Sequence, residues 1–90
     1  MKTKIELHTF ATFEEAVFQM NLGEAFLEFD EGKSASEEFN DSRFSLEDNM
    51  KMFDNFIDFL NSSGSFNLRW GVLKSGHFFV IDLNEETEDV

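Results

Sequence analysis

The apolar positions between residues 46 and 60 recur three and four residues apart, which is the spacing of one face of an α-helix. They are Leu46, Met50, Phe53, Phe56, Ile57 and Leu60. Ser45 precedes this stripe and is a good N-cap, because its hydroxyl can accept a hydrogen bond from a free backbone N–H of the first turn. Gly64 can take the left-handed conformation that commonly ends a helix. The pattern predicts a long amphipathic helix over residues 45–64 that supplies the centre of the core.

Two further elements are predicted near the start of the chain. Residues 4–10 alternate between apolar and polar side chains, which is typical of a half-buried β-strand. Thr12 and Glu15 then have the spacing of a capping box, in which two side chains satisfy free N–H groups at the start of a helix. A short apolar stripe follows, beginning at Phe13. We expect a helix that begins after Thr12 and ends near Asn21.

The chain between residues 25 and 44 has weaker patterns. Residues 25–30 alternate between two sets of side chains, so this stretch is predicted to be a second strand. Residues 33–43 show no convincing period, and their Ser, Asn and Asp content favours a loop. In an alternative, residues 34–39 form an edge strand that pairs with the second strand through a turn at Glu31 and Gly32.

Two β-rich runs on either side of Ser75 and Gly76 predict a C-terminal hairpin over residues 66–84 with a two-residue turn. This register places Arg69 opposite Asp82, an opposite-charge pair of the kind that stabilises sheets. The face with Arg69 also carries Leu73, Phe78 and Val80. The face toward the core carries Leu68, Trp70, Val72, Phe79, Ile81 and Leu83.

Together these elements predict an α+β fold, a two-layer sandwich in which two helices pack on one face of a small, mostly antiparallel sheet. Their order is strand, helix, strand, loop, helix, strand, strand. Residues 1–84 form a single α+β domain in this scheme, and residues 85–90 form an acidic tail that is expected to fray. A chain of 90 residues can bury one small core, for which its thirteen Phe are the main material.

The sequence does not have the usual marks of secretion or membrane insertion. It contains no Cys, so it offers no disulfide and no cysteine ligand. Residues 1–10 are charged and have no continuous apolar core, unlike a signal peptide. No run approaches the roughly 18 apolar residues that a membrane span needs. We therefore expect a soluble, cytoplasmic protein.

The charge balance is the least ordinary feature of the chain. Nineteen Asp and Glu oppose seven Lys and Arg, which gives a formal net charge of −12. A protein with this charge repels nucleic acid and anionic lipid, and it attracts basic proteins. The alternative is that the acidic residues serve only solubility.

Patterns typical of catalysis and of metal binding are not found in the sequence. The two histidines, His8 and His77, lie in predicted strands without the surroundings of a catalytic triad. The five glycines are scattered singly, so they form no phosphate-binding loop. Residues 30–38 lack the alternating oxygen ligands and the central glycine of an EF-hand. We predict that the protein is not an enzyme and has neither a cofactor nor a specific metal site.

The carboxylates are the first candidate for a binding surface. Asp54 and Asp58 are one helical turn apart, with Cβ atoms about 5–6 Å from each other. Carboxylates at such spacings can imitate the anionic surface of a nucleic acid and block a protein that grips phosphates with Lys and Arg. The alternative is a solvated acidic face without a partner. The expected partner-binding residues are Glu28, Asp30, Glu37, Glu38, Asp41, Glu47, Asp54 and Asp58.

Apolar residues left outside the predicted core are the second candidate. Exposed apolar patches mark interfaces, and a symmetric homodimer is the commonest result. Phe26 or Phe78 could also supply the apolar anchor of a charged interface. In another alternative, the loop over residues 33–44 covers the patch. The expected interface residues are Phe26, Leu73, Phe78 and Val80.

In size, acidity and lack of catalytic residues, the chain resembles the small inhibitors that phages and mobile elements carry. These include anti-restriction and anti-CRISPR proteins, DNA-mimic inhibitors and the immunity proteins that neutralise nuclease toxins. The resemblance concerns overall character, so no functional residue follows from it. It implies an inhibitor that occupies the basic, nucleic-acid-binding surface of a partner protein. The alternative function is a small homodimeric structural or assembly module whose acidity serves solubility alone.

Overall fold

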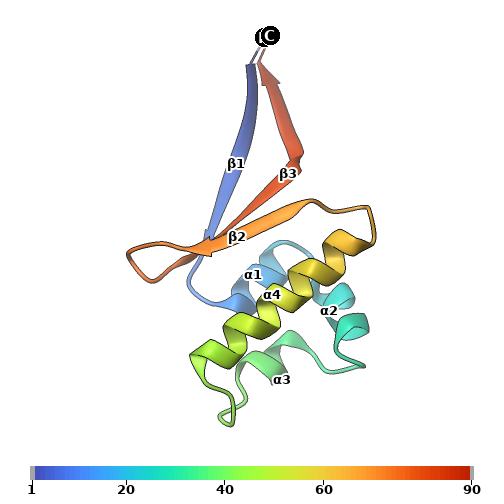
Figure 1. The fold of residues 1–90 in the computed structure, drawn as a ribbon, viewed down its shortest axis with the longest axis vertical. Coiled ribbons are helices and arrows are strands. Elements are labelled where there is room, and N and C mark those ends of the chain that lie inside the picture. The colour runs from blue at the N-terminus through green and yellow to red at the C-terminus, as the bar shows by residue number, and fades with distance from the viewer. Residues whose placement is uncertain (1, 90) are drawn as a thin grey trace.

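The fold is an α+β arrangement in which helices cover one face of a small antiparallel sheet. The computed structural model describes the backbone of residues 2–89 and the side chains of residues 7–83. Figure 1 shows the four helices of this described chain below the sheet. The predicted fold class is confirmed, although four helices take the place of the two expected. The elements are β1 (Lys2–Phe10), α1 (Phe13–Gln19), α2 (Gly23–Phe29), α3 (Ala35–Phe39), α4 (Leu46–Ser62), β2 (Leu68–Val72) and β3 (Phe78–Asp89).

β3 is the central strand of the sheet, with β1 on one side and β2 on the other, both antiparallel to it. β1 and β3 pair as far as Lys2 and Asp89, with a change of register after Ile5. Figure 1 shows this pairing as a two-stranded arm that rises beyond β2. β3 therefore includes residues 85–89, which were expected to be a frayed tail, and Val90 lies outside the described residues.

α4 confirms the helix that the apolar stripe predicted. The Ser45 hydroxyl accepts the Asp48 N–H at 3.1 Å, and the Asp48 carboxylate accepts the Ser45 N–H at 3.0 Å. This capping box lowers the pKa of Asp48, because the hydrogen bonds favour its charged form. Gly64 follows the helix with a φ of +82°. The stripe enters the core through Phe53, Phe56, Ile57 and Leu60.

α1 also begins where the sequence predicted. The Thr12 hydroxyl accepts the Glu15 N–H at 3.1 Å and caps the helix. The Glu15 carboxylate accepts the Ala11 N–H at 3.1 Å, one residue earlier than in the usual capping box. After the helix, Asn21 adopts a left-handed conformation with a φ of +58°, which turns the chain toward α2.

Residues 25–29 belong to α2, so the prediction of a second strand is wrong. The positions that enter the core have helical spacing, because Leu22 and Phe26 are buried and Phe29 is half-buried. A short apolar run does not distinguish a strand from a buried helix by its period alone. The Phe26 ring lies 5.0 Å from that of Phe56 on α4, measured between centroids. Packing against α4 therefore stabilises the helical conformation.

Residues 35–39 form the short helix α3, where the sequence favoured a loop or an edge strand. The Ser34 hydroxyl accepts the Glu37 N–H at 3.2 Å and caps this helix. The single turn buries Ala35 and brings the Phe39 ring to 5.5 Å from that of Phe13. A helix of this length has too few residues to show a period. The edge strand is wrong, and the predicted loop over residues 33–43 holds only on either side of α3.

The C-terminal hairpin is present as β2 and β3, but its turn is one residue longer than predicted. The Leu73 N–H donates to the His77 carbonyl at 2.8 Å, and the Gly76 N–H donates to the Leu73 carbonyl at 3.0 Å. These bonds enclose a three-residue loop of Lys74, Ser75 and Gly76. Gly76 has a φ of +92°, as expected for the last residue of such a loop.

The longer turn shifts the register of the hairpin by one residue, which moves the β3 side chains to the opposite face, while Leu68 and Trp70 of β2 face the core as predicted. Arg69 lies opposite Ile81, so the predicted cross-strand pairing of Arg69 with Asp82 is wrong. Phe78 and Val80 point toward the helices and are 7% and 0% exposed. The two β3 residues that the sequence placed on the outer face of the hairpin are therefore core residues.

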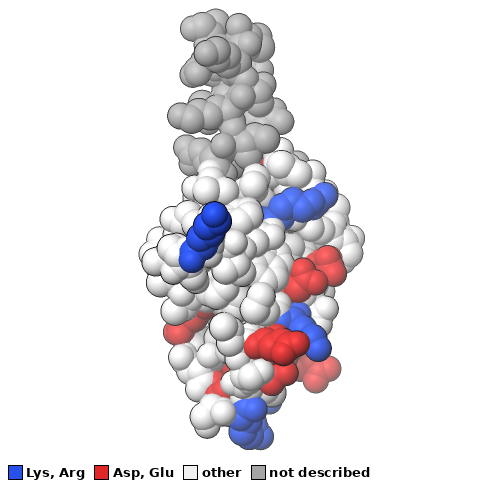
Figure 2. Space-filling model, turned by 60° about the vertical axis from the view of Figure 1, so that its left-hand side comes forward, with Lys and Arg blue, Asp and Glu red and all other residues white. Residues whose placement is uncertain are grey.

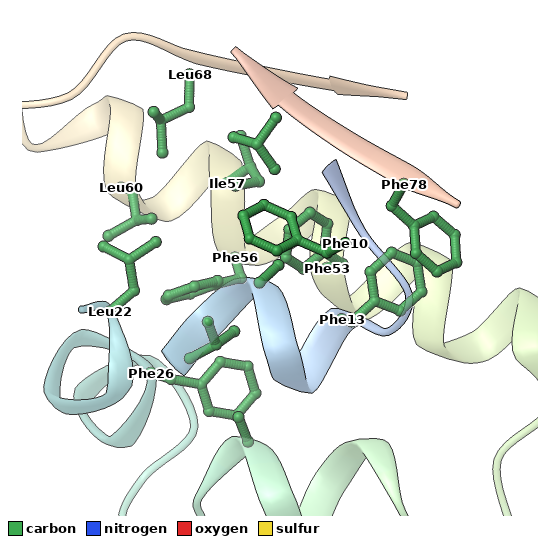
Figure 3. Close-up of a cluster of buried hydrophobic side chains, with 14 residues drawn as sticks. Phe10, Phe13, Leu22, Phe26, Phe53, Phe56, Ile57, Leu60, Leu68 and Phe78 are labelled. Carbon is green, nitrogen blue, oxygen red and sulfur yellow. The ribbon is translucent and has the colours of Figure 1, made fainter. Parts of the chain in front are cut away.

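The core beneath the sheet is built mainly from Phe side chains. Figure 3 shows Phe13 and Phe78 with their rings close together, and their centroids are 3.9 Å apart in a stacked arrangement. Phe26 is fully buried in the same cluster. The expected exposed apolar surface is thus corrected, because Phe26, Phe78 and Val80 lie in the core. Leu73 alone of the four expected interface residues remains partly exposed.

The other face of the sheet carries apolar side chains, and no helix of the described chain covers it. Leu7 is 52% exposed there, and its neighbours Phe79 and Ile81 are partly exposed. The Phe79 ring lies across Gly71, where an added Cβ would come within 2.6 Å of two ring carbons. We call this surface, formed by Leu7, Leu73, Phe79, Ile81 and Leu83, the open sheet face.

Candidate functional site

A groove lies between α4 and β2 and contains both carboxylates that the sequence placed one helical turn apart. Its volume is about 360 Å³. Ile57 and Leu68 are buried at 3% and 1% exposure and form its apolar base. The groove exists because the apolar stripe of α4 packs beneath β2 and leaves the polar side of the helix next to the strand. Its lining is completed by Asp54, Asp58, Asn61, Arg69 and Trp70.

Asp54 is held in place by Trp70. The Trp70 ring stands edge-on to the rings of Phe13 and Phe53, with centroids 5.6 and 5.2 Å away. Its indole N–H donates to Oδ1 of Asp54 at 2.9 Å. The aromatic core therefore orients a carboxylate that is itself exposed to solvent. Asp58 is also exposed, and neither carboxylate forms an ion pair among the side chains of residues 7–83.

Asn61 closes one end of the groove by binding the backbone of β2. Its Oδ1 accepts the Leu68 N–H at 2.8 Å, and its Nδ2 donates to the Leu68 carbonyl at 3.1 Å. These are the two bonds that a residue of a neighbouring strand would form. Nη1 of Arg69 also donates to the Leu68 carbonyl, at 2.8 Å. The side-chain amide thus substitutes for one residue of a missing strand.

Three other expected partner-binding residues, Glu28, Glu37 and Glu47, are exposed as predicted. Glu47 lies in the first turn of α4, two turns before Asp54, so it shares that side of the helix. Glu28 and Glu37 belong to α2 and α3 and do not line the groove. The structure therefore brings Asp54 and Asp58 together on α4 with Glu47 further along the same side, and leaves Glu28 and Glu37 on separate helices.

Glu38 is buried and Asp30 is half-buried in the helical layer, so both are weaker candidates for partner binding than the sequence suggested. Glu38 is 8% exposed, and its Oε1 lies 3.6 Å from Nζ of Lys33. Oδ2 of Asp30 is buried without a hydrogen-bond partner among the described residues. Burial, and then the adjacent Glu38 carboxylate, raise the pKa of Asp30.

Asp41 is already paired within the chain. Nη2 of Arg43 lies 2.6 Å from Oδ2 of Asp41. The hydrogen bonds from Arg43 lower the pKa of Asp41 to about 2. The negative charge of Asp41 is thus partly neutralised, and this residue is a weaker candidate for partner binding than the sequence suggested.

The charged side chains do not form one continuous acidic face in the view of Figure 2. Red and blue side chains alternate along its right-hand margin, and a broad white area lies beside them. On α4 itself, Lys51 lies four residues after Glu47 and three before Asp54. In this view the negative charge is therefore local, and the groove with Asp54 and Asp58 is the acidic site that the structure defines best.

Two other hollows occur in the described part of the molecule. One of about 240 Å³ lies between β1 and the α1–α2 turn and includes Phe10 and Leu22. The other, of about 300 Å³, includes Phe39 and Asn49, whose Oδ1 is buried without a hydrogen-bond partner among the described residues. Residues 7–83 contain no cluster of three or more potential metal ligands. No described helix combines the length and apolarity needed to cross a membrane.

Comparison with known proteins gives no family assignment, because no family model, curated protein or solved structure matches this chain. The candidate function therefore rests on the groove and on the strand beside it. Sequence reasoning identified Asp54 and Asp58 but did not single out Asn61 or Trp70 as parts of the site. Their roles depend on the approach of α4 to β2, which no local pattern reveals.

Proposed function

We propose that this protein is a small acidic inhibitor that binds the basic, nucleic-acid-binding surface of a partner protein. The observation that carries the proposal is the pair of exposed carboxylates, Asp54 and Asp58, in the groove beside β2, which form no ion pair with the side chains of residues 7–83. A cytoplasmic location and a phage or mobile-element type belong to the same proposal and rest on the sequence alone.

The orientation of Asp54 supports this function. Because Trp70 already holds the carboxylate, a Lys or Arg of the partner can pair with it at a smaller cost in side-chain entropy. The net charge of −12 would steer a basic protein toward this surface and make the association sensitive to salt. The base formed by Ile57 and Leu68 adds an apolar area that the partner can desolvate.

The test compares two double variants with the same change in net charge. Asp54→Asn with Asp58→Asn removes the groove pair, and Glu24→Gln with Glu31→Gln neutralises two exposed acids on other segments. Each immobilised protein is incubated with a cell lysate at low salt, and bound proteins are released by salt or by duplex DNA. We expect the wild type and the control to retain DNA-displaceable, nucleic-acid-binding proteins.

For a captured protein, we expect the groove variant to bind about tenfold more weakly at low salt, which corresponds to about 1.4 kcal/mol. The loss should be smaller at high salt, since screening weakens the contribution of exposed charges. Equal losses in the two double variants, or equal losses at both salt concentrations, would show that the groove carboxylates are not the binding site.

A second candidate function is favoured by the open sheet face. We propose as the alternative that two copies pack through this face and form a homodimeric assembly module, with the acids serving solubility. The supporting observation is the 52% exposure of Leu7 beside the partly exposed Phe79 and Ile81. Leu7→Glu should then convert a dimer to a monomer in sedimentation velocity. A wild-type protein that is monomeric at high concentration would exclude this alternative.

A further inference from the structure

β2 forms one margin of the sheet, and the backbone groups on its outer side can be assigned from its turn. The Leu73 N–H bonds to His77, and the Leu83 N–H bonds to the Asn67 carbonyl. In an antiparallel pair, residues that bond across to the neighbour alternate with residues whose N–H and C=O point away. Leu68, Trp70 and Val72 are therefore the residues of β2 whose backbone groups face outward.

On the outward side of β2, a side chain already bonds to the backbone of Leu68, and the later residues have no such bond in the described part of the chain. Asn61 occupies both the N–H and the carbonyl of Leu68. Trp70 and Val72 have no such side chain on their outward backbone groups in the described part of the chain. Val72 is 48% exposed, as expected for a strand position without an outer neighbour. Figure 1 shows β2 at the margin of the sheet, crossing over α4.

The groove runs alongside this open margin. A residue paired with Trp70 on an added strand would point its side chain to the same side of the sheet as Trp70. That is the helical side, where Asp54 and Asp58 line the groove. An added strand would thus place alternate side chains next to two carboxylates.

The charges of the molecule indicate which kind of added strand fits beside β2. A second copy would bring a second net charge of −12, together with its own Asp54 and Asp58, against the same groove. An extended segment with Lys or Arg at alternate positions has the complementary charge. We propose that an extended basic segment of a partner protein adds to β2 as a fourth strand, bonding to the backbone of Trp70 and Val72. This inference rests on the proposed function and specifies how the partner is bound.

The first test uses a short peptide in which Arg and Val alternate, and two variants at one position. Val72→Pro removes the outward N–H, and proline is tolerated on an edge strand when its N–H side faces solvent. Val72→Thr keeps the N–H and a β-branched side chain, so it is the matched control. Binding is followed by the fluorescence of Trp70, the only tryptophan of the chain, and by the amide shifts of β2.

We expect the wild type and Val72→Thr to bind the peptide with shifts centred on Trp70 and Val72. Val72→Pro should bind about tenfold more weakly while its melting temperature shows a folded protein. Equal binding by the Pro and Thr variants would overturn the proposal. So would shifts confined to α4, because the peptide would then be held by charge without strand pairing.

A second test keeps the protein unchanged, so it does not depend on the folding of a variant. N-methylation of alternate residues of the peptide blocks one of its two backbone edges. Methylation of the edge that faces β2 should abolish binding, and methylation of the other edge should preserve it. The proposal is wrong if both methylated peptides bind equally well.

The contribution of the groove carboxylates is tested separately with Asp58→Asn. This variant should bind the unmodified peptide more weakly than the wild type does, and the loss should be larger at low salt than at high salt.

The two proposals fail in different ways. If a captured nucleic-acid-binding protein depends on Asp54 and Asp58 but binds Val72→Pro as tightly as Val72→Thr, the proposed function stands and the strand addition is wrong. If the peptide pairs with β2 but no basic protein competes with it, the proposed function fails. If Val72→Pro instead converts a dimer of the wild type to a monomer, the occupant is a second copy and the inference is overturned.

Discussion

The two faces of the sheet are made by alternate residues of the same strands, yet they have opposite environments. Phe78 is 7% exposed and stacks on Phe13 in the core. Phe79, the next residue, lies across Gly71 on the open sheet face. Both faces carry large apolar side chains, so the presence of such side chains alone does not decide which face the helices cover.

The difference between the faces is decided by the β2–β3 turn. With a loop of three residues, the bonds of Leu73 with His77 and Gly76 place Phe78 on the helical side. A loop of two residues would place Phe79 there instead. One residue of loop length therefore determines which half of the apolar side chains forms the core and which half remains available for contacts.

The largest effect is expected from shortening this turn. Deletion of Lys74 should force a two-residue loop and expose Phe78 and Val80, because their strand positions move to the other face. We expect loss of cooperative unfolding, since the change removes most of a stability that is typically about 5–15 kcal/mol. Lys74→Ala keeps the loop length and should unfold like the wild type. Thermal unfolding measured by circular dichroism distinguishes these outcomes, and a cooperatively folded deletion variant would contradict the pairing of Val72 with Phe78.

A smaller but sharper difference is expected between two neighbouring Phe residues. Phe78→Ala should lower the free energy of unfolding by about 3–5 kcal/mol, because it leaves a cavity against Phe13. Phe79→Ala removes a partly exposed ring and should cost about 1 kcal/mol. Urea unfolding monitored by Trp70 fluorescence measures both values. Similar losses in the free energy of unfolding for the two variants would mean that both faces of the sheet are equally buried.

The smallest effect on stability is expected at Leu7. Leu7→Glu changes a side chain that is 52% exposed on the open sheet face, so the free energy of unfolding of the monomer should change by no more than about 0.5 kcal/mol. A loss of several kcal/mol in the same urea experiment would show that this face is covered in solution. The variant then tests dimer formation without disturbing the fold.

The sequence predicted the elements whose patterns are long or have local signals. α4 combines a stripe of six apolar residues with a capping box at Ser45, and both α1 and the hairpin have turn or capping residues at their ends. α2 and α3 are short helices that depend on contacts with Phe56 and Phe13. Such contacts join distant parts of the chain and leave no local pattern, so a strand and a loop were predicted instead.

The candidate site was predicted in part for the same reason. Asp54 and Asp58 follow from the helical period of α4, which the sequence shows clearly. The sequence does not show that Glu38 is buried beside Asp30 or that Asn61 binds Leu68, because each depends on packing between elements. The hairpin register was missed because Ser75 and Gly76 fit a two-residue turn as well as the last two positions of a three-residue loop.

The position of β3 between β1 and β2 has a consequence for the order of folding. β2 and β3 are close neighbours in the chain, whereas β1 reaches β3 only after the whole helical segment has been looped out between Phe10 and Phe78. Closing a long loop is entropically costly, and contacts between distant residues slow folding. We therefore expect α4 and the hairpin to form an early nucleus, with the docking of β1 as the late, rate-limiting event.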